Sequence, residues 1–122
     1  MGKLEERRKF VRLNILADVL YTKKALSEQE KVSLTKNISG GGICLIAYDD
    51  LHESDILDLQ IYLPEDKAPI TALGRVAWVN EFVVGDTSVG KRLDVGIEFI
   101  EIKENERVKI DKYVFTHVEI DG

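Results

Sequence analysis

The sequence predicts an all-β domain with a terminal helix: a six-stranded antiparallel β-barrel followed by one C-terminal α-helix. Three observations lead to this prediction. Apolar and polar residues alternate with a period of two over most of the chain, the connections are short and rich in turn-forming residues, and a helical period appears only at the end. With 122 residues, of which 44% are hydrophobic, the chain fits one domain. We expect a flexible basic segment over residues 1–12 and a single barrel domain with its helix over residues 13–122.

The first three strands are expected over residues 13–21, 31–37 and 42–47. Residues 13–21 alternate imperfectly, which is typical of a half-buried strand, and residues 31–37 alternate more cleanly. One face of the first strand carries Leu13, Ile15, Ala17, Val19 and Tyr21. Residues 42–47 (GICLIA) form a short apolar run bounded by glycine and by the polar residues YDD, and this pattern indicates a buried strand.

The remaining strands are expected over residues 55–63, 70–84 and 92–102. The first of them alternates Ile and Leu with Asp and Gln, and Pro64 and Pro69 then mark a turn. Gly74 lies inside the long strand that follows, where it suggests a bulge or a bend in a closed sheet. Hairpin-length connections favour antiparallel pairing, and closure into a barrel removes the bare edges that an open sheet would leave.

The helical period begins at Glu104, and Asn105 is a candidate N-cap. Apolar and aromatic residues then recur at the i, i+3, i+4 and i+7 positions of one helical face: Ile110, Tyr113, Val114 and His117. This helix is expected to cover one mouth or one side of the barrel.

Composition and charge exclude several classes of protein. A net charge of -5 and a pI of about 5.1 argue against a general surface for nucleic-acid polymers. No stretch approaches the ~18 to 20 apolar residues of a membrane span, and no secretory signal is visible, so we expect a cytoplasmic protein without membrane insertion. The single cysteine, Cys44, excludes an internal disulfide framework.

The sequence contains no recognisable catalytic or metal site, and we expect neither enzymatic activity nor a metal. His52 lies in an acidic loop and His117 on the expected helix, and no serine lies in a nucleophile elbow. A group of loop carboxylates lacks the spacing of a calcium-binding loop: Asp49, Asp50, Glu53 and Asp55. Trp78 and Phe82 share one strand face, where core packing is the expectation and base stacking requires an open face.

Positive charge is concentrated at the N-terminus. Residues 1–12 carry five basic and two acidic side chains, a balance of +3, so the other residues sum to -8. A solvated basic tail without a function is one explanation of this cluster. A small anionic ligand is the other, because a few arginines suffice to bind it while the rest of the protein remains acidic.

Two short motifs occur on either side of the second expected strand. Arg8-x-x-x-Arg12 precedes the first strand, and Asn37-x-Ser39-x-x-Gly42 lies between the second and the third. Together with the closing DVGIEF strand, they resemble the PilZ domain, the bacterial receptor module for cyclic di-GMP. The resemblance runs from about Glu5 to the C-terminal helix, the GRVAW stretch is similar to the usual fifth strand of that family, and the family also implies the six-stranded barrel with a terminal helix.

By this resemblance, cyclic di-GMP would be bound by Arg8, Arg12, Asn37, Ser39 and Gly42. The chemistry of these residue types agrees. A guanidinium can pair bidentately with a phosphate or with the O6/N7 edge of guanine, and short polar side chains can hold both a turn and a ligand edge. Gly41 and Gly42 let the backbone and a ligand approach closely. Asparagine is one of two residues that the family allows at position 37, but it offers one acceptor oxygen and no charge.

The resemblance also carries an expectation about stoichiometry. Members of the family bind either one ligand molecule or a stacked pair, and an arginine just before the first motif goes with the pair; this sequence has Arg7 there. We therefore expect two cyclic di-GMP molecules per chain and an unidentified downstream protein that responds to binding. One alternative stays open at this stage, a degenerate barrel that makes only protein contacts. A single-stranded nucleic-acid barrel would need basic and aromatic residues spread along a strand face, and that pattern is missing here.

Overall fold

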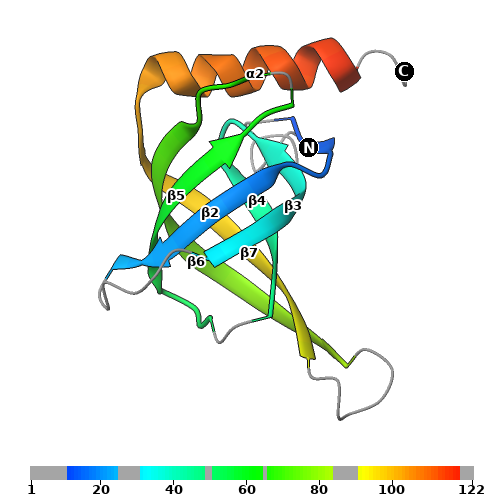
Figure 1. Ribbon diagram of the computed structural model, residues 1–122, viewed down its shortest axis with the longest axis vertical. Helices are drawn as coiled ribbons and strands as arrows, with labels where there is room; N and C mark the ends of the chain where they lie inside the picture. The colour runs from blue at the N-terminus through cyan, green and yellow to red at the C-terminus, as the bar shows by residue number, and fades with distance from the viewer. Residues whose placement is uncertain (1–10, 25–30, 49–50, 65, 84–90, 119–122) are drawn as a thin grey trace, which may run out of the picture.

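The computed structural model describes residues 11–24, 31–48, 51–64, 66–83 and 91–118. This part of the chain contains seven strands and one long helix (Figure 1). The elements are β1 (Leu13–Asn14), β2 (Asp18–Lys23), β3 (Lys31–Ser39), β4 (Gly42–Ala47), β5 (Ile56–Tyr62), β6 (Ile70–Val83), β7 (Lys91–Ile102) and α2 (Glu104–Val118). The predicted flexible segment, residues 1–12, lies outside the described residues except for Val11 and Arg12.

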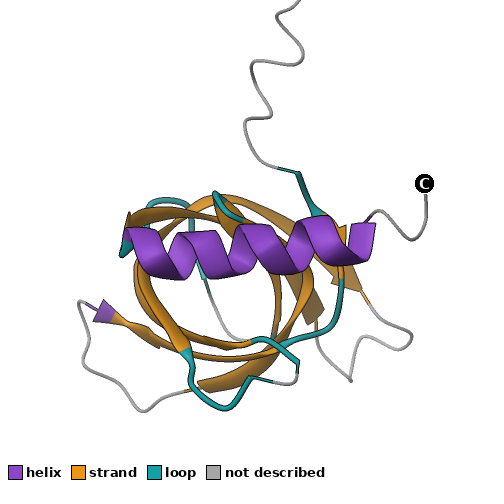
Figure 2. Ribbon diagram, turned by 90° about the horizontal axis from the view of Figure 1, so that it is seen from above, coloured by secondary structure: helices purple, strands orange, loops and turns teal. Residues whose placement is uncertain are grey.

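Six of these strands close into a barrel. The order is β3-β2-β5-β6-β7-β4, and β4 pairs back onto β3, with every pair antiparallel. The view from above in Figure 2 shows the closed ring with α2 lying across its mouth. The predicted fold, a closed six-stranded antiparallel barrel with a C-terminal helix, is therefore confirmed.

The prediction of one continuous strand over residues 13–21 is wrong. The chain forms β1 and β2 instead, which pair with the same side of β3 but are separated at residues 15–17. Backbone bonds to β3 continue there, from the Ile15 amide to the Lys36 carbonyl at 3.1 Å and from the Thr35 amide to the Ala17 carbonyl at 2.9 Å. The Thr35 side chain adds two more: its Oγ1 donates to the Ile15 carbonyl at 2.6 Å and accepts from the Ala17 amide at 3.0 Å. The predicted inward face is kept across the break by the buried residues Leu13, Ala17, Val19 and Tyr21.

The core fills the barrel and continues under the helix. Ile38, Leu45 and Val95 are fully buried inside the ring, and Ile110 and Val114 of α2 are buried against it. The helix face was therefore predicted correctly, because its apolar residues must cover the open mouth.

The predicted helix cap is one feature that the structure corrects. Helix α2 begins at Glu104, and the carbonyl of Lys103 accepts hydrogen bonds from the amides of Glu106 and Arg107, each at 3.0 Å. Lys103 therefore occupies the capping position, and Asn105 lies inside the first turn. The chain passes directly from β7 into the helix, which leaves no room for a cap two residues later.

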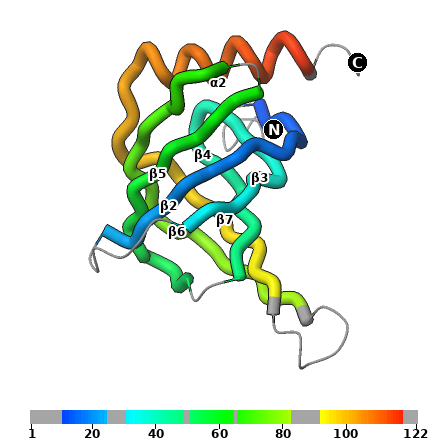
Figure 3. Tube along the Cα trace, in the orientation of Figure 1, coloured from blue at the N-terminus to red at the C-terminus, as the bar shows by residue number. Residues whose placement is uncertain are grey.

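β6 and β7 form the longest pair and extend beyond the ring at the end away from α2 (Figure 3). The bulge predicted at Gly74 is confirmed, since the register shifts between Leu73 and Gly74. A Cβ on Gly74 would lie 2.5 Å from the Ile97 side chain, so this strand packs closely over the core. A second register shift occurs between Val76 and Trp78.

Candidate functional site

Arg12 and Asn37 are 25 residues apart in sequence and meet on the outer face of the barrel. β1 is antiparallel to the end of β3, with Asn14 opposite Asn37. This pairing places Arg12, immediately before β1, beside Asn37, and Arg12 Nη1 donates to Asn37 Oδ1 at 2.7 Å. One residue from each predicted motif is therefore in direct contact. Arg7 and Arg8 lie outside the described residues.

The turn between β3 and β4 carries the rest of the second motif. The Ser39 hydroxyl accepts from the Gly41 amide at 3.1 Å and donates to the Gly42 carbonyl at 3.3 Å. Ser39 is buried, and the Gly41 carbonyl accepts from the amide of Phe99 at 2.9 Å. In this structure Ser39 shapes the turn, while Arg12 and Asn37 present polar atoms on the outer face.

Two further contacts fix this turn. A Cβ on Gly42 would lie 2.1 Å from the Ile97 carbonyl oxygen, so a side chain at this position would force β4 away from β7. On the other side, Arg107 of α2 donates from Nε to the Gly40 carbonyl at 3.1 Å. The sequence analysis did not select Arg107, because nothing in the helical period indicates a contact with a turn so far away in the chain.

Four residues in register form a row across the outer faces of four strands: Asn37, Cys44, Gly96 and Trp78. The indole of Trp78 covers Gly96, since a Cβ on that glycine would lie 2.1 Å from the Trp78 ring. Trp78 and Phe82 are 42% and 44% exposed. The expectation that they pack in the core is therefore wrong; the outward pairing of Trp78 with Gly96, next to the bulge in β6, turns the ring to the outside.

A buried carboxylate lies beside this row. Asp94 on β7 is 4% exposed, and Lys36 Nζ lies 2.8 Å from its Oδ2 and Arg92 Nη2 lies 3.0 Å from its Oδ1. Burial acts to raise the pKa of Asp94, but the hydrogen bonds and charges of Lys36 and Arg92 outweigh it and hold the pKa below its ordinary value. Sequence reasoning did not select these three residues, although Lys36 directly precedes the motif residue Asn37.

The Cys44 thiol lies under the same charged groups. Burial raises the pKa of Cys44, the Asp94 carboxylate raises it further, and Lys36 and Arg12 act in the opposite direction. The thiol therefore stays protonated and is a poor nucleophile. We use the name motif wall for this part of the outer face, defined by Lys36, Asn37, Cys44, Asp94 and Gly96. Together with Arg12 beside it, the motif wall offers cations and hydrogen-bond donors to an anion.

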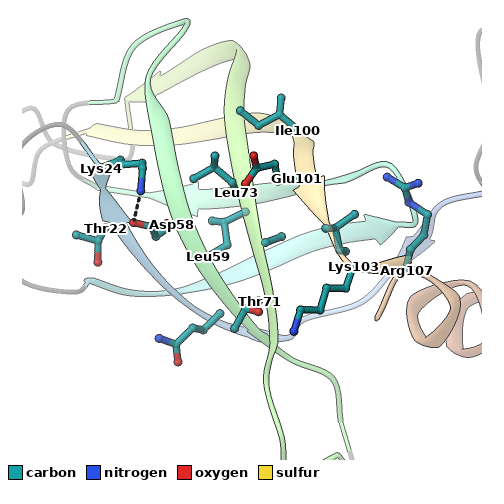
Figure 4. Close-up of a pocket in the computed structure, with 13 residues that line it drawn as sticks. Thr22, Lys24, Asp58, Leu59, Thr71, Leu73, Ile100, Glu101, Lys103 and Arg107 are labelled. Atoms are coloured by element: carbon teal, nitrogen blue, oxygen red, sulfur yellow. Dashed lines mark ion pairs between the residues drawn. The ribbon is translucent and has the colours of Figure 1, made fainter. Parts of the chain in front are cut away.

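The opposite side of the barrel is hollowed and carries charges of both signs. An open groove of about 1030 Å³ runs over β2, β5, β6 and the end of β7, and Arg107 lies at its helix end (Figure 4). Its charges are of both signs, and Lys24 lies 4.0 Å from Asp58 (Figure 4). We call it the groove wall, defined by Lys24, Asp58, Thr71, Leu73 and Glu101. Of the predicted ligand-binding residues, those that the structure describes do not line this groove.

The described ranges contain neither a metal-binding cluster nor a membrane-spanning helix. No group of three or more His, Cys, Asp or Glu side chains there could hold a metal ion. None of the helices in that part of the chain combines the length and the apolar character needed to cross a membrane.

Comparison with known proteins gives one family and several similar structures. The PilZ domain model matches residues 6–116. No curated protein matches the chain. The inhibitor of motility MotI/DgrA of Bacillus subtilis is 25% identical, with a TM-score of 0.74 over 93% of this chain and 52% of the MotI chain.

Two further structures share the fold at lower identity. The PilZ domain of YcgR from Escherichia coli, determined with c-di-GMP, is 12% identical over 94% of both chains, with a TM-score of 0.71. The K. pneumonia MrkH-c-di-GMP complex is 17% identical over 93% of this chain and 52% of the MrkH chain, with a TM-score of 0.70. The chain thus spans about half the length of the MotI and MrkH chains that it matches.

Proposed function

Because the chain belongs to the PilZ domain family, whose members are binding modules and not enzymes, we propose that it is a receptor and adaptor for cyclic di-GMP. Binding would change the surface of the domain and so regulate a partner protein. The observation that carries this proposal is the contact between Arg12 and Asn37, which joins the two predicted ligand-binding motifs on one face.

The proposed roles follow from what each residue offers. Arg8 and Arg12 bind phosphate and guanine groups, since a guanidinium pairs with either. The Asn37 amide contacts a polar ligand edge, and its Oδ1 already accepts from Arg12, so binding shares or replaces that bond. Ser39, Gly41 and Gly42 hold the turn in shape and keep the backbone open to the ligand.

We further propose that each chain binds two ligand molecules and that Arg7 contributes to the second. Two stacked cyclic dinucleotides bring four negative charges together, and an additional guanidinium both offsets their repulsion and stacks on a base. The site needs no metal under this proposal. The protein acts in the bacterial cytoplasm on a downstream protein, without inserting into a membrane and without binding a nucleic-acid polymer.

Titration calorimetry with cyclic di-GMP, compared with GMP and cyclic AMP, tests the receptor function. We expect saturable heat with cyclic di-GMP and much weaker binding of the two mononucleotides, which each carry one phosphate and one base. A wild-type protein that shows neither heat nor chemical-shift changes at high concentrations of cyclic di-GMP would refute the proposal.

A second candidate function, protein contacts alone, is favoured by exposed apolar side chains on the same barrel. Val32 and Leu34 on β3 and Tyr48 after β4 are exposed, and apolar surface of this kind often marks interaction sites. If the calorimetric experiment fails, this interaction module becomes the preferred function.

A further inference from the structure

A bulge in β3 places a lysine beside the predicted ligand-binding asparagine. Thr35 pairs with Leu45 and Asn37 pairs with Cys44, so Lys36 is an extra residue without a position of its own on β4. Thr35 points into the barrel and is fully buried, whereas Lys36 and Asn37 both make side-chain contacts on the outer face. Bulges commonly redirect a side chain in this way.

Asp94 determines where the lysine ammonium lies. Lys36 Nζ is 2.8 Å from Asp94 Oδ2, and the side chain of Lys36 is 43% exposed while that of Asp94 is 5% exposed. The carboxylate therefore lies underneath and the cation faces outward. Arg92 lies against the same carboxylate and over the ring of Phe82, 5.5 Å from its centroid, so the carboxylate is held from two sides.

The cluster retains positive charge after this pairing. Arg12, Lys36 and Arg92 carry three positive charges and Asp94 carries one negative charge, so the four groups have an excess of two positive charges. Arg12 and Lys36 both act electrostatically on Cys44, which lies on β4 between Asn37 of β3 and Gly96 of β7. Both cations therefore lie near Asn37, on a protein whose overall charge is -5.

We propose that Lys36, positioned by Asp94, directly contacts a phosphate of cyclic di-GMP next to Asn37. This inference rests on the proposed receptor function. An ammonium has three donors, and the Asp94 hydrogen bond uses one of them. Lysine binds phosphate as a point charge, so it tolerates either phosphate of the ligand, whereas Arg12 makes directed contacts. Asp94 is a positioning residue in this arrangement and does not touch the ligand.

Lys36→Gln is the direct test, and Lys24→Gln is its matched control. Lys24 is also a β-barrel lysine paired with an aspartate, but it lies on the groove wall. We expect Lys36→Gln to weaken cyclic di-GMP binding about ten-fold and Lys24→Gln to leave it unchanged. Lys36→Arg should recover most of the affinity, because it keeps the charge. Thermal unfolding of each variant shows whether the barrel is intact. We expect an intact barrel, because the side chains of Lys36 and Lys24 are exposed.

The salt dependence of the dissociation constant separates a direct contact from structural support. Removing a cation that faces the ligand should make binding by Lys36→Gln less sensitive to added salt than binding by the wild type. Weaker binding with an unchanged salt dependence would mean that Lys36 only supports Asn37, and it would overturn the direct contact. Equal binding by Lys36→Gln and the wild type would overturn this inference and leave the receptor function intact. No binding by the wild type would overturn both.

Discussion

The motif wall and the groove wall belong to one barrel but differ in what they offer a ligand. The groove wall is hollow, and its exposed charges are of both signs, as in the Lys24–Asp58 pair. The motif wall has a buried carboxylate, Asp94, covered by cations, with the Arg12–Asn37 contact beside it. Under the proposed function, converging donors and excess positive charge select the small anion, and a concave surface alone does not define the site.

The difference arises from irregularities in the strands. The bulge in β3 adds Lys36 to the motif wall, and the second bulge in β6 goes with the outward position of Trp78. On the groove wall, β2 and β5 pair without a register shift, and the shift between Leu73 and Gly74 adds an exposed apolar residue, Ile100, instead of a cation. The following predictions test whether binding and stability really divide between the two walls in this way.

The largest effect is expected from Gly42→Ala, which tests the close approach of β4 and β7. The added Cβ would meet the Ile97 carbonyl oxygen at 2.1 Å, and a backbone atom cannot rotate away. We expect the free energy of unfolding in urea to fall by roughly 1–3 kcal/mol. Gly96→Ala is the control and should cost less, because its Cβ meets the exposed Trp78 ring. A Gly42→Ala protein as stable as the wild type would contradict the close approach.

The next effect is the loss of ligand affinity in Arg12→Ala. A hydrogen bond with a charged group contributes about 1.5–3 kcal/mol, so calorimetry should show cyclic di-GMP binding weakened about ten-fold or more. Lys103→Ala removes an equal charge at the edge of the groove and should change the affinity little. An equal loss of affinity in Lys103→Ala and Arg12→Ala would contradict the distinction between the two walls.

Asp94 makes stability depend on pH. The pKa of Asp94 in the folded protein lies below its ordinary value of 3.8, so its contribution is present above that value and is lost as the pH falls through the folded pKa. Between about pH 5 and pH 3, the wild type should lose stability faster than Asp94→Asn, which lacks the titrating group. Urea unfolding at several pH values measures this difference.

Asp58→Asn is the groove-wall control for that experiment. The Asp58 side chain is 57% exposed, and exposed ion pairs contribute little to stability, so its curve should run parallel to that of the wild type. Parallel curves for Asp94→Asn and the wild type would show that the Lys36–Asp94–Arg92 cluster does not stabilise the fold.

The smallest change in affinity is expected from Arg7→Leu. Arg8, Arg12 and Asn37 would still bind the first cyclic di-GMP molecule, so the variant should keep most of its affinity while the titration endpoint moves from two ligands per chain to one. Calorimetry and sedimentation with absorbing ligand both report this endpoint. A wild type that saturates at one equivalent, or a variant that still binds two, would rule out the role of Arg7 without affecting the receptor function.

Much of the fold could be predicted because each strand of the barrel has one face toward the core and one face toward the outside. Most inward positions carry an apolar side chain, so the sequence pattern predicted the last five strands within two residues of their observed bounds. Helix α2 must cover the mouth, and its period was equally clear. That Arg12 and Asn37 belong to one site was expected from the resemblance of the two motifs to the PilZ domain, and periodicity alone did not indicate it.

The remaining features depend on contacts between distant residues. At the break between β1 and β2 the Thr35 hydroxyl bonds to Ile15 and Ala17, and periodicity does not indicate such a partner. The exposure of Trp78 depends on the pairing of β6 with β7, which no local pattern defines. Lys36 belongs to the motif wall through a bulge and through Asp94, 58 residues away in the chain.

The bond from Arg107 to the Gly40 carbonyl links two parts of the chain that are 67 residues apart. Helix α2 contains no residue of either motif, so the motifs alone do not indicate that the helix supports the turn. A substitution that removes this guanidinium nevertheless alters the support of the turn between Ser39 and Gly42. We therefore expect a substitution in the helix to affect the shape of a turn that lies outside it.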